Sequence, residues 1–390
     1  MAPLDGIRVV DFTAAMAGPT CSMLLADFGA DVIKIEPPGG EFGRKWGAYR
    51  HGEQGDFTGL FLALNRNKRS VALNLKDADD LAFAHDLMAS ADVVLENYSP
   101  GVADKLGIGY ERARELNPQV VYCSISGFGS NGPMRNRPGL DLLLQAYCGH
   151  LSITGEEDRP SVRIGHSAID LLSGTNAALG IVLALRERDR TGQGQSLDTS
   201  LYESALELVS HFIGAYTGSG EVPGKSGPYF AFASPYGMFH ARDREFFMGP
   251  ADERMWRSLC TAIDREDLTE RPEFATNSDR IRNREALHAE LMPILATRDA
   301  QEWVDLCIEH RIPTSLVYDM SEVVEQEQAA ARDMFVDTGV DGIKVVGLPI
   351  KLHGTPGEIR WHAPHAGEHN AQLRAELAAA RASPAGSAAS

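Results

Sequence analysis

The chain has 390 residues, of which 43% are apolar and 23% are charged, and its formal net charge is −17. This composition is typical of a globular protein with a core large enough for two or three folding units. So acidic a chain is repelled by nucleic acid and by anionic lipid, so we expect neither as a partner. No basic stretch precedes an apolar core at the start, and the apolar run 177–185 is too short to span a bilayer, so we expect no signal peptide and no membrane span. Five scattered cysteines without a Cys-x-x-Cys pair predict reduced thiols in a cytoplasmic protein.

Short β-rich runs alternate with helical stretches in roughly the first third of the chain. The helical stretches are 19–29 and 77–90. The runs expected to be buried parallel strands are 7–12, 32–36, 70–75, 92–96 and 120–125. This β-α-β alternation predicts an α/β fold, with a Rossmann-like large domain built on a parallel sheet.

The remaining chain is predicted to complete this domain and to add a second one. Residues 169–188 form the best helix, and because they are apolar on nearly every side we expect them to be buried. A Gly/Pro-rich stretch at 218–228 indicates a linker. We therefore expect a large Rossmann-like, ligand-binding domain at 1–220 that is completed by 331–380, a small α+β domain at 225–330, and a disordered tail at 381–390. Within the small domain we predict strands and helices at 235–239, 245–248, 252–263, 284–296 and 300–310.

The first β-α-β unit has the layout of a dinucleotide site, and Glu36 ends its second strand where a ribose-binding acid would lie. The glycine-rich fingerprint is missing, because the turn from Ala14 to Pro19 reads Ala-Ala-Met-Ala-Gly-Pro. Without those glycines the backbone cannot approach a pyrophosphate in the usual way, so we expect no NAD.

Gly165-His-Ser167-Ala-Ile169 comes close to the nucleophile elbow of hydrolases. Ile169 stands where the second glycine belongs, so the tight turn that exposes a catalytic serine is not encoded. We interpret Ser167 as a loop residue before a helix.

His362, His365 and His369 cluster near the C-terminus. Pro364 and Gly367 prevent a helix that would bring these side chains together, and no cysteine joins them. A loop with solvated histidines is favoured over a metal site, so we expect no metal.

Basic residues are scarce, and several gather in the first α/β region, close to the ends of predicted strands. They are Arg44, Lys45, Arg66, Lys68, Arg69, Lys76, Lys105, Arg135 and Arg137. Each alone is explained as a solvated surface charge. Because open α/β sheets bind ligands at the carboxyl ends of their strands, the group together could hold a phosphate-rich molecule.

Asp170 begins the long apolar helix. Its plainest role is to interact with the positive end of the helix dipole. The loop before it contains Gly165, which would let backbone N–H groups approach a substrate oxygen. The residues alone leave a structural acid, a nucleophile and a base as open alternatives.

As a set, these motifs resemble the class III CoA-transferases, the family that includes formyl-CoA transferase and α-methylacyl-CoA racemase. The likeness extends over nearly the whole chain, and its motifs are specific through their order and spacing. They lie at 4–12, 17–19, 25–36, 65–76, 91–97, 126–129, 132–133, 190–195 and 367–369.

The resemblance implies an interlocked homodimer whose substrates are an acyl-CoA donor and a carboxylic acid acceptor. It implies that Asp170 is the nucleophile, which passes through an aspartyl mixed anhydride and an aspartyl-CoA thioester. An ordinary aspartate is ionised at neutral pH and suits this role. The same resemblance places the contacts to coenzyme A at Met16, Ala17, Leu73, Asn74, Leu75, Lys76, Asn97, Tyr98, Lys105 and Arg137.

Two departures from the family pattern reduce the range of reactions and substrates that we expect. Leu140 occupies the position of the histidine that racemases of this family use as a base, and leucine cannot abstract a proton. The glycine-rich loop of formyl-CoA transferase has no clear match near 218–237, which argues against a formyl or oxalyl substrate. Racemase-type proton transfer and a non-catalytic acyl-CoA-binding subunit remain the alternatives.

Overall fold

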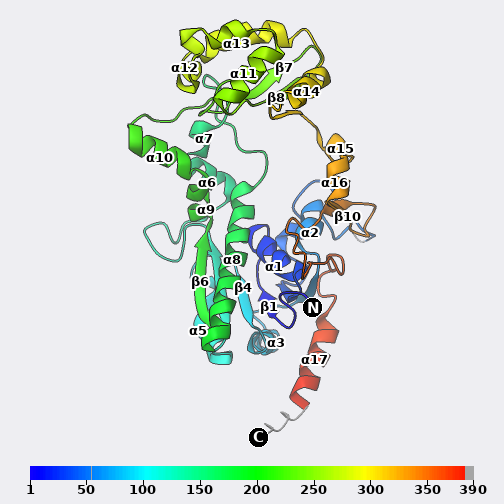
Figure 1. Cartoon of the computed structure of the whole chain (residues 1–390). Coiled ribbons are helices and arrows are strands. Elements are labelled where there is room, and N and C mark those ends of the chain that lie inside the picture. Colours follow the sequence, from blue (N-terminus) through cyan, green and yellow to red (C-terminus); the bar gives the residue numbers. More distant parts are fainter. Residues whose placement is uncertain (54, 383–390) are drawn as a thin grey trace. The chain divides into compact units, whose positions relative to one another are not determined.

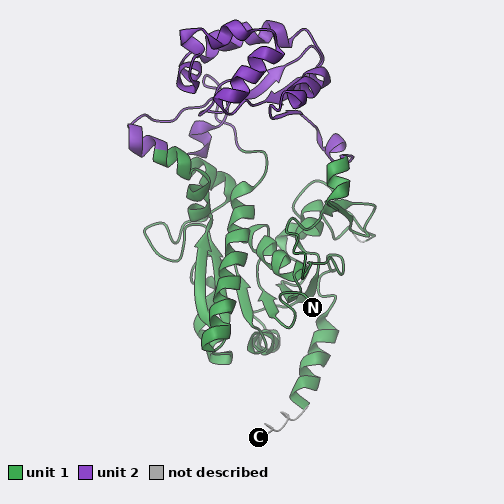
Figure 2. Ribbon diagram, in the orientation of Figure 1, with its two compact units in different colours: residues 1–148, 164–214, 327–390 green, residues 149–163, 215–326 purple. Residues whose placement is uncertain are grey.

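The computed structural model describes residues 1–53 and 55–382. The chain divides into two compact units (Figure 2). Unit 1 comprises Met1–Cys148, Ile164–Gly214 and the described chain from Glu327 onward, and unit 2 comprises Gly149–Arg163 and Ala215–Gln326. The chain therefore leaves unit 1 and returns to it twice.

Unit 1 is built on a six-stranded sheet of strands that are all parallel, in the order β3-β2-β1-β4-β5-β6 (Figure 1). This is the order of doubly wound nucleotide-binding folds. The strands are β1 (Arg8–Asp11), β2 (Asp31–Glu36), β3 (Lys68–Ala72), β4 (Val93–Glu96), β5 (Val121–Ser126) and β6 (Gln195–Ser200). The predicted α/β fold is confirmed.

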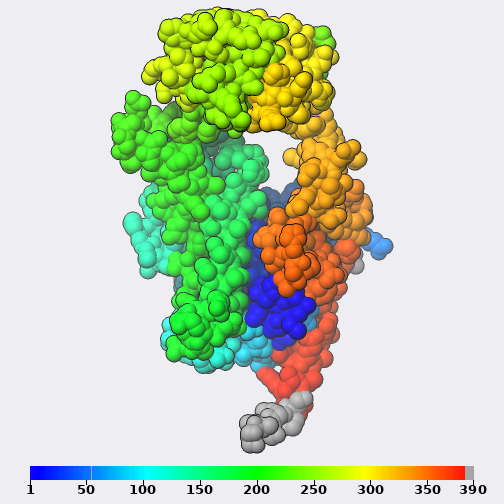
Figure 3. Space-filling view, viewed as in Figure 1, coloured from blue at the N-terminus to red at the C-terminus, as the bar shows by residue number. Residues whose placement is uncertain are grey.

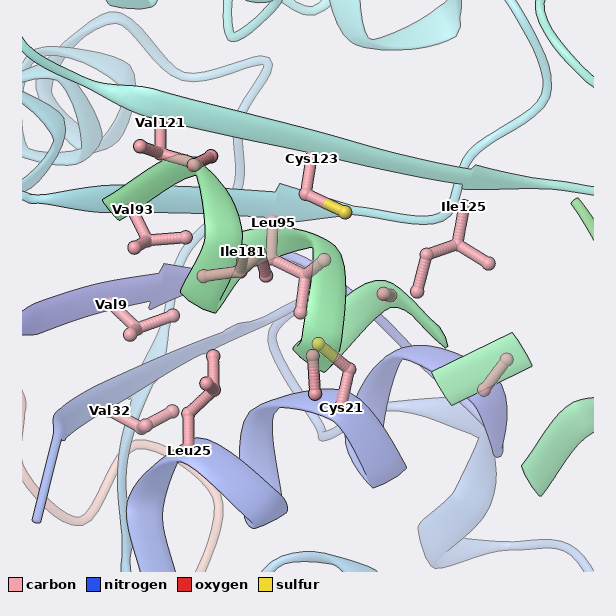
Figure 4. Packing of buried hydrophobic residues seen from close by; sticks show 14 of the residues in the cluster. Val9, Cys21, Leu25, Val32, Val93, Leu95, Val121, Cys123, Ile125 and Ile181 are labelled. Atoms are coloured by element: carbon pink, nitrogen blue, oxygen red, sulfur yellow. The ribbon is translucent and has the colours of Figure 1, made fainter. Parts of the chain in front are cut away.

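Helices cover both faces of this sheet. Those of unit 1 are α1 (Ala17–Asp27), α2 (Gly59–Leu64), α3 (Ala78–Ala89), α4 (Val102–Lys105), α5 (Tyr110–Leu116), α6 (Asp141–Tyr147), α8 (Ala168–Thr191), α9 (Leu201–Leu208), α16 (Glu327–Ala331) and α17 (Asn370–Ala382). Helices α1 and α8 pack on one face, where Cys21, Leu25 and Ile181 meet the valine side chains of the strands (Figure 4). Helices α3, α5 and α17 cover the other face. A two-stranded antiparallel ribbon, β10 (Phe335–Asp337) and β11 (Lys344–Val346), completes the unit.

The approach of α1 to α8 depends on one glycine. A Cβ added at Gly174 would lie 2.4 Å from the carbonyl oxygen of Ala17 and 2.7 Å from the Cβ of Thr20. No side chain fits at that position, so the backbones of the two helices can come this close only with glycine there.

The structure adds one strand to the sheet that the sequence did not predict, the edge strand β6. Its sequence is Gln-Ser-Leu-Asp-Thr-Ser, and its side chains are largely exposed. A strand with a single paired edge and polar side chains carries no apolar alternation, so the pattern that revealed the buried strands is absent here.

The prediction that the long helix is buried on every side is wrong for the single chain. Helix α8 buries Ile169, Ala177 and Ile181 against the sheet, but Leu179 and Leu183 are 59% and 61% exposed. In Figure 3 the green atoms, which belong to α8 and the segments that follow it, cover much of one side of unit 1. Among the described residues α8 alone has the length and apolar content of a membrane span, yet it is partly buried as a core helix of unit 1.

Unit 2 is an α+β unit with its own core. Its three-stranded antiparallel sheet contains β7 (Gly237–His240), β8 (Glu245–Met248) and β9 (Thr314–Leu316). Its helices are α7 (His150–Ile153), α11 (Glu253–Ala262), α12 (Asn277–Arg282), α13 (Arg284–Leu295), α14 (Ala300–Glu309) and α15 (Met320–Val323), while α10 (Ser210–Ser219) crosses from unit 1. Short 3₁₀ helices cover Phe42–Arg44 in unit 1 and Glu266–Thr269 and Pro272–Phe274 in unit 2.

The sequence-based division placed residues 149–163 in the large domain, whereas their contacts place them in unit 2. Gly227 donates its N–H to the carbonyl of Gly155, and Lys225 donates to the carbonyl of Arg159. These contacts join segments far apart in the chain, which no local pattern reveals. Residues 383–390 of the predicted disordered tail lie outside the described residues, and α17 ends at Ala382.

Candidate active site

Asp170 lies in the first turn of α8, beside a second acid, Asp141, at the start of α6. The Oδ2 atom of Asp141 accepts hydrogen bonds from the backbone N–H groups of Ile169, at 2.9 Å, and Asp170, at 3.3 Å. Ser167, at the N-cap position of α8, makes no capping hydrogen bond with its side chain. Asp141 therefore caps α8 from another helix and fixes the backbone that carries Asp170.

Asp141 is itself held by Gln145, one turn further along α6. The amide of Gln145 donates to Asp141 Oδ1 at 2.5 Å, and its Oε1 accepts from the N–H of Ile164 at 2.9 Å. Gln145 is fully buried. Through these contacts α6 holds both ends of the segment from Ile164 to Asp170.

The surroundings of Asp170 disfavour its charge. Burial first, and the neighbouring carboxylate of Asp141 second, raise the pKa of Asp170 to about 7. The expectation of an ordinary, fully ionised aspartate is therefore wrong for this environment. A carboxylate that is poorly solvated and close to its pKa at neutral pH is the kind of group found at functional sites.

The backbone donors near Asp170 fall into two groups. The N–H groups of Ala168, Ile169, Asp170 and Leu171 are all used, since Ala168 donates to His166 and Leu171 to Ser167. The helix N-terminus is therefore not available to bind an oxyanion. Within the described chain, the N–H groups of Gly165, His166 and Ser167 have no hydrogen-bond acceptor.

Asp170 lies on the side of α8 that faces the start of α1. Residues four apart share a helix face, and Gly174 contacts Ala17. The close approach of the two helices thus brings the predicted contact residues Met16 and Ala17 toward the turn of α8 that carries Asp170.

A cavity of about 400 Å3 lies at the carboxyl ends of β1 to β3. Its wall includes Leu73, Asn74, Leu75, Lys76 and Tyr98, which are five of the residues predicted to contact coenzyme A. The wall also includes Thr13 and Ala14 from the loop before α1. The structure therefore gathers half of the predicted contacts, from separate segments, at one edge of the sheet.

Asn97 is engaged with the protein itself. Its Oδ1 accepts from the N–H of Ala14 at 3.0 Å and its Nδ2 donates to the carbonyl of Ala14 at 2.9 Å. Both polar atoms of the amide thus bind the loop, so Asn97 acts on the cavity by holding its wall.

Arg137 and Lys105 lie outside the wall of this cavity, and both are exposed. A second cavity, of about 450 Å3, shares Tyr98 with the first and includes Arg135 and Asn136, the neighbours of Arg137. Lys105 ends α4, which supplies Ala103 and Asp104 to that second cavity.

The basic residues grouped by sequence divide into buried ion pairs and free cations. Arg44 binds Glu36 at 2.7 Å, Arg66 binds Asp27 at 2.7 Å, and Lys68 is fully buried 3.5 Å from Asp11. These three are structural and do not form a phosphate cradle. Lys76 and Lys105, by contrast, are exposed and have no side-chain partner in the described part of the chain.

The C-terminal histidines take separate partners. His369 accepts a hydrogen bond from the N–H of Ser70, and His365 binds Asp56. Over the described ranges, no three His, Cys, Asp or Glu side chains come together as metal ligands would.

The sequence did not assign roles to Asp141, Gln145, Lys34 or Glu41, which the structure brings to this region. Asp141 follows Leu140, the position compared with the racemase histidine, so attention to that motif could have found it. Lys34 carried a signal too, since a lysine inside the apolar strand Asp-Val-Ile-Lys-Ile-Glu requires a buried partner. The sequence contains no comparable signal for Gln145 or Glu41.

The profile of CoA-transferase family III matches residues 4–370, and the chain belongs to this family. The chain is therefore a CoA-transferase, and the recognised resemblance is confirmed.

Relatives with assigned activities match over almost their whole length. Acetyl-CoA:oxalate CoA-transferase of Acetobacter aceti is 36% identical, with 97% of each chain covered. Succinyl-CoA:mesaconate CoA-transferase of Haloarcula hispanica is 36% identical, with 96% of each chain covered. A solved structure of a CAIB/BAIF family protein from Brucella suis is 33% identical, with a TM-score of 0.87, and covers 96% of this chain and 99% of its own.

Proposed function

We propose that the protein moves coenzyme A from an acyl-CoA thioester to a carboxylic acid, with Asp170 as the nucleophile. The observation that carries this proposal is the position of Asp170: a poorly solvated carboxylate at the start of α8, with its pKa raised to about 7 and held by Asp141. Desolvation strengthens a carboxylate as a nucleophile because less hydration is lost during attack.

The first half of the reaction transfers the CoA group to the enzyme. A carboxylate oxygen of Asp170 attacks the thioester carbonyl, and the C–S bond breaks to release CoA thiolate and leave an aspartyl mixed anhydride. The thiolate then attacks the aspartyl carbonyl and expels the donor acid as its carboxylate. The enzyme now holds an aspartyl-CoA thioester.

The second half runs the same chemistry in reverse with the acceptor. The carboxylate of the incoming acid attacks the aspartyl-CoA carbonyl and displaces thiolate, forming a second mixed anhydride. The thiolate attacks the acyl carbonyl of the acceptor and frees Asp170. Each attack creates an oxyanion, for which the free N–H groups of Gly165, His166 and Ser167 in the preceding loop are candidate donors.

We propose a dicarboxylic acid as the acceptor. The acids in the names of the relatives from Acetobacter aceti and Haloarcula hispanica, oxalate and mesaconate, are both dicarboxylates. A second carboxylate would give the enzyme a charged group with which to orient the acid.

We also propose that the active protein is a homodimer. The exposed apolar side chains of α8, Leu179, Val182 and Leu183, form part of a surface that a second copy would cover. Proton transfer of the racemase type is not favoured, because Leu140 is apolar and 67% exposed and offers no second base.

The test is CoA exchange between succinyl-CoA and a panel of dicarboxylates, followed by mass spectrometry of the thioesters. Asp170→Ala and Asp170→Asn should each lower exchange by about a thousandfold or more. Asp189→Asn, at the exposed far end of the same helix, is the matched control and should exchange like the wild type. Exchange by Asp170→Ala at the rate of the control would refute the proposal.

A further inference from the structure

The loop that joins β1 to α1, residues 13–16, is held almost entirely by side chains. Thr13 donates its N–H to Asp11 Oδ1 at 2.8 Å, and its carbonyl accepts from Lys34 Nζ at 2.8 Å. Both backbone groups of Ala14 bind Asn97, and the N–H of Ala15 donates to Glu41 Oε2 at 3.1 Å. Five successive backbone groups are therefore fixed by four side chains, of which Asp11 and Lys34 come from strands β1 and β2, and Glu41 and Asn97 from the loops after β2 and β4.

The backbone of this loop is in a conformation that its sequence does not favour. Ala15 has a φ of +67°, in the left-handed region. A residue with a Cβ adopts this region at a cost of about 1 kcal/mol, and it persists only where the surroundings hold it. In a glycine-rich loop the same conformation would be free of that cost.

Lys34 and Glu41, the two oppositely charged side chains that bind the loop, are deeply buried. Lys34 is 0% exposed and Glu41 is 3% exposed, and Lys34 Nζ lies 3.5 Å from Glu41 Oε1. That oxygen of Glu41 makes no hydrogen bond in the described part of the chain, so nearby positive charge compensates it, and Lys34 is its ion-pair partner. Burying such a pair rarely adds stability compared with apolar side chains, so stability alone does not account for it.

The loop separates two parts of the site. On one side Thr13 and Ala14 form the wall of the 400 Å3 cavity that also includes Leu73, Lys76 and Tyr98. On the other side the loop leads into α1, whose first residue, Ala17, contacts α8 at Gly174. Any shift of the loop would therefore move the predicted contacts to coenzyme A relative to Asp170.

We propose that Lys34, with Glu41 as its counter-ion, is a positioning residue for the CoA thioester. Through Thr13 and Ala15 the pair holds the β1–α1 loop in its left-handed turn, and so replaces the glycines that shape this loop in dinucleotide-binding folds. Lys34 acts only through the loop, because no part of it lines the cavity, whereas Glu41 also forms part of the cavity wall. This inference rests on the proposed function.

The test is CoA binding measured by calorimetry, which needs no turnover. The Lys34→Met/Glu41→Gln double variant removes both charges at once, so neither is left buried and alone. We expect its CoA dissociation constant to rise about tenfold or more, because the loop loses its preorganisation. Hydrogen exchange at residues 13–16 should become faster, while the β-strands keep their protection.

A matched control removes a buried ion pair of unit 1 that does not touch the loop. Arg66 and Asp27 form such a pair at 2.7 Å, and both are at most 3% exposed. Arg66→Met/Asp27→Asn should lose stability but keep the CoA affinity of the wild type. Equal loss of affinity in both double variants would overturn the inference, since general destabilisation would then explain it.

Rescue by glycine is the sharpest readout. Ala15→Gly alone should change CoA affinity by less than about twofold, because glycine accepts the same φ. Added to Lys34→Met/Glu41→Gln, it should recover about threefold or more of the lost affinity. No recovery, with the fold intact by hydrogen exchange, would overturn the inference. If the wild type itself binds no CoA, the proposed function fails, which is a different result from equal binding by the wild type and the double variant.

Discussion

Two acids define the chemistry of the site at the scale of single residues. Asp141 holds the backbone of Ile169 and Asp170 through one carboxylate oxygen, and its charge opposes ionisation of Asp170. The same side chain therefore positions the nucleophile and tunes it. The two effects can be separated, because asparagine keeps the acceptor oxygen and removes the charge.

Asp141→Asn should shift the acid limb of the profile of kcat/KM against pH. In the wild type that limb should have an apparent pKa near 7, since only ionised Asp170 can attack. Removing the neighbouring charge lowers the pKa of Asp170, so the variant should keep its activity to lower pH. The apparent pKa of this limb should still lie above that of an ordinary aspartate. Burial is the larger cause of the raised pKa of Asp170, and the substitution does not remove it. A limb at the same pH in both proteins would show that Asp141 does not tune Asp170.

The raised pKa of Asp170 also predicts how stability depends on pH. Between about pH 4 and pH 7 the folded chain holds a proton on Asp170 that the unfolded chain has lost, so the free energy of unfolding falls as pH rises through this range. Because asparagine does not ionise, the free energy of unfolding of Asp170→Asn should not show this decrease. At pH 8 the variant should be more stable than the wild type, by on the order of 1–2 kcal/mol, and near pH 4 the two should be alike. Urea denaturation at both pH values measures this, and a variant that is less stable at pH 8 would contradict the assigned environment.

At the scale of secondary structure, the site depends on how closely α1 approaches α8. Gly174→Ala would place a methyl group 2.4 Å from the carbonyl oxygen of Ala17. Because that neighbour is backbone, the helices must separate, and we expect a loss of about 1–3 kcal/mol in stability. The CoA affinity should fall with it, since α1 carries Ala17.

Gly214→Ala in α10 is the control for this change, since an added Cβ there meets nothing within 4 Å. It should leave stability unchanged or raise it, because alanine favours a helix over glycine. Thermal unfolding and CoA calorimetry on both variants make the comparison. If Gly174→Ala behaves like the control, the close contact of α1 with α8 does not matter.

The sequence predicted those elements whose burial leaves an apolar pattern. The strands β1, β2, β4 and β5 were expected to within about two residues because both of their faces are covered. Strand β6 was missed because it is a polar edge strand.

Among the site residues, the order of the motifs identified Asp170. It did not identify Gln145 and Glu41, because their roles depend on hydrogen bonds to residues 19 and 26 positions away in the sequence. Contacts of this kind follow from the tertiary fold and leave no local signature.

At the scale of the whole molecule, the apolar face of α8 predicts association of two chains. Leu183 is 61% exposed, and a charge placed on a buried interface would be costly. Leu183→Glu should therefore shift a dimer toward monomer in sedimentation equilibrium. Arg112→Glu, at an exposed position of α5 on the opposite face of the sheet, should leave the dimer intact. A wild-type protein that sediments as a monomer would refute the dimer.

The measurement that tests the central claim most directly is capture of the covalent intermediate on Asp170. The enzyme is incubated with succinyl-CoA in the absence of acceptor, treated with hydroxylamine, digested, and analysed by mass spectrometry. Hydroxylamine attacks an aspartyl thioester or anhydride and leaves a hydroxamate on the nucleophile, so the peptide that contains Asp170 should carry this mark, and only when the acyl-CoA is present. An unmodified Asp170 during active CoA exchange, or the mark on another carboxylate, would contradict the account.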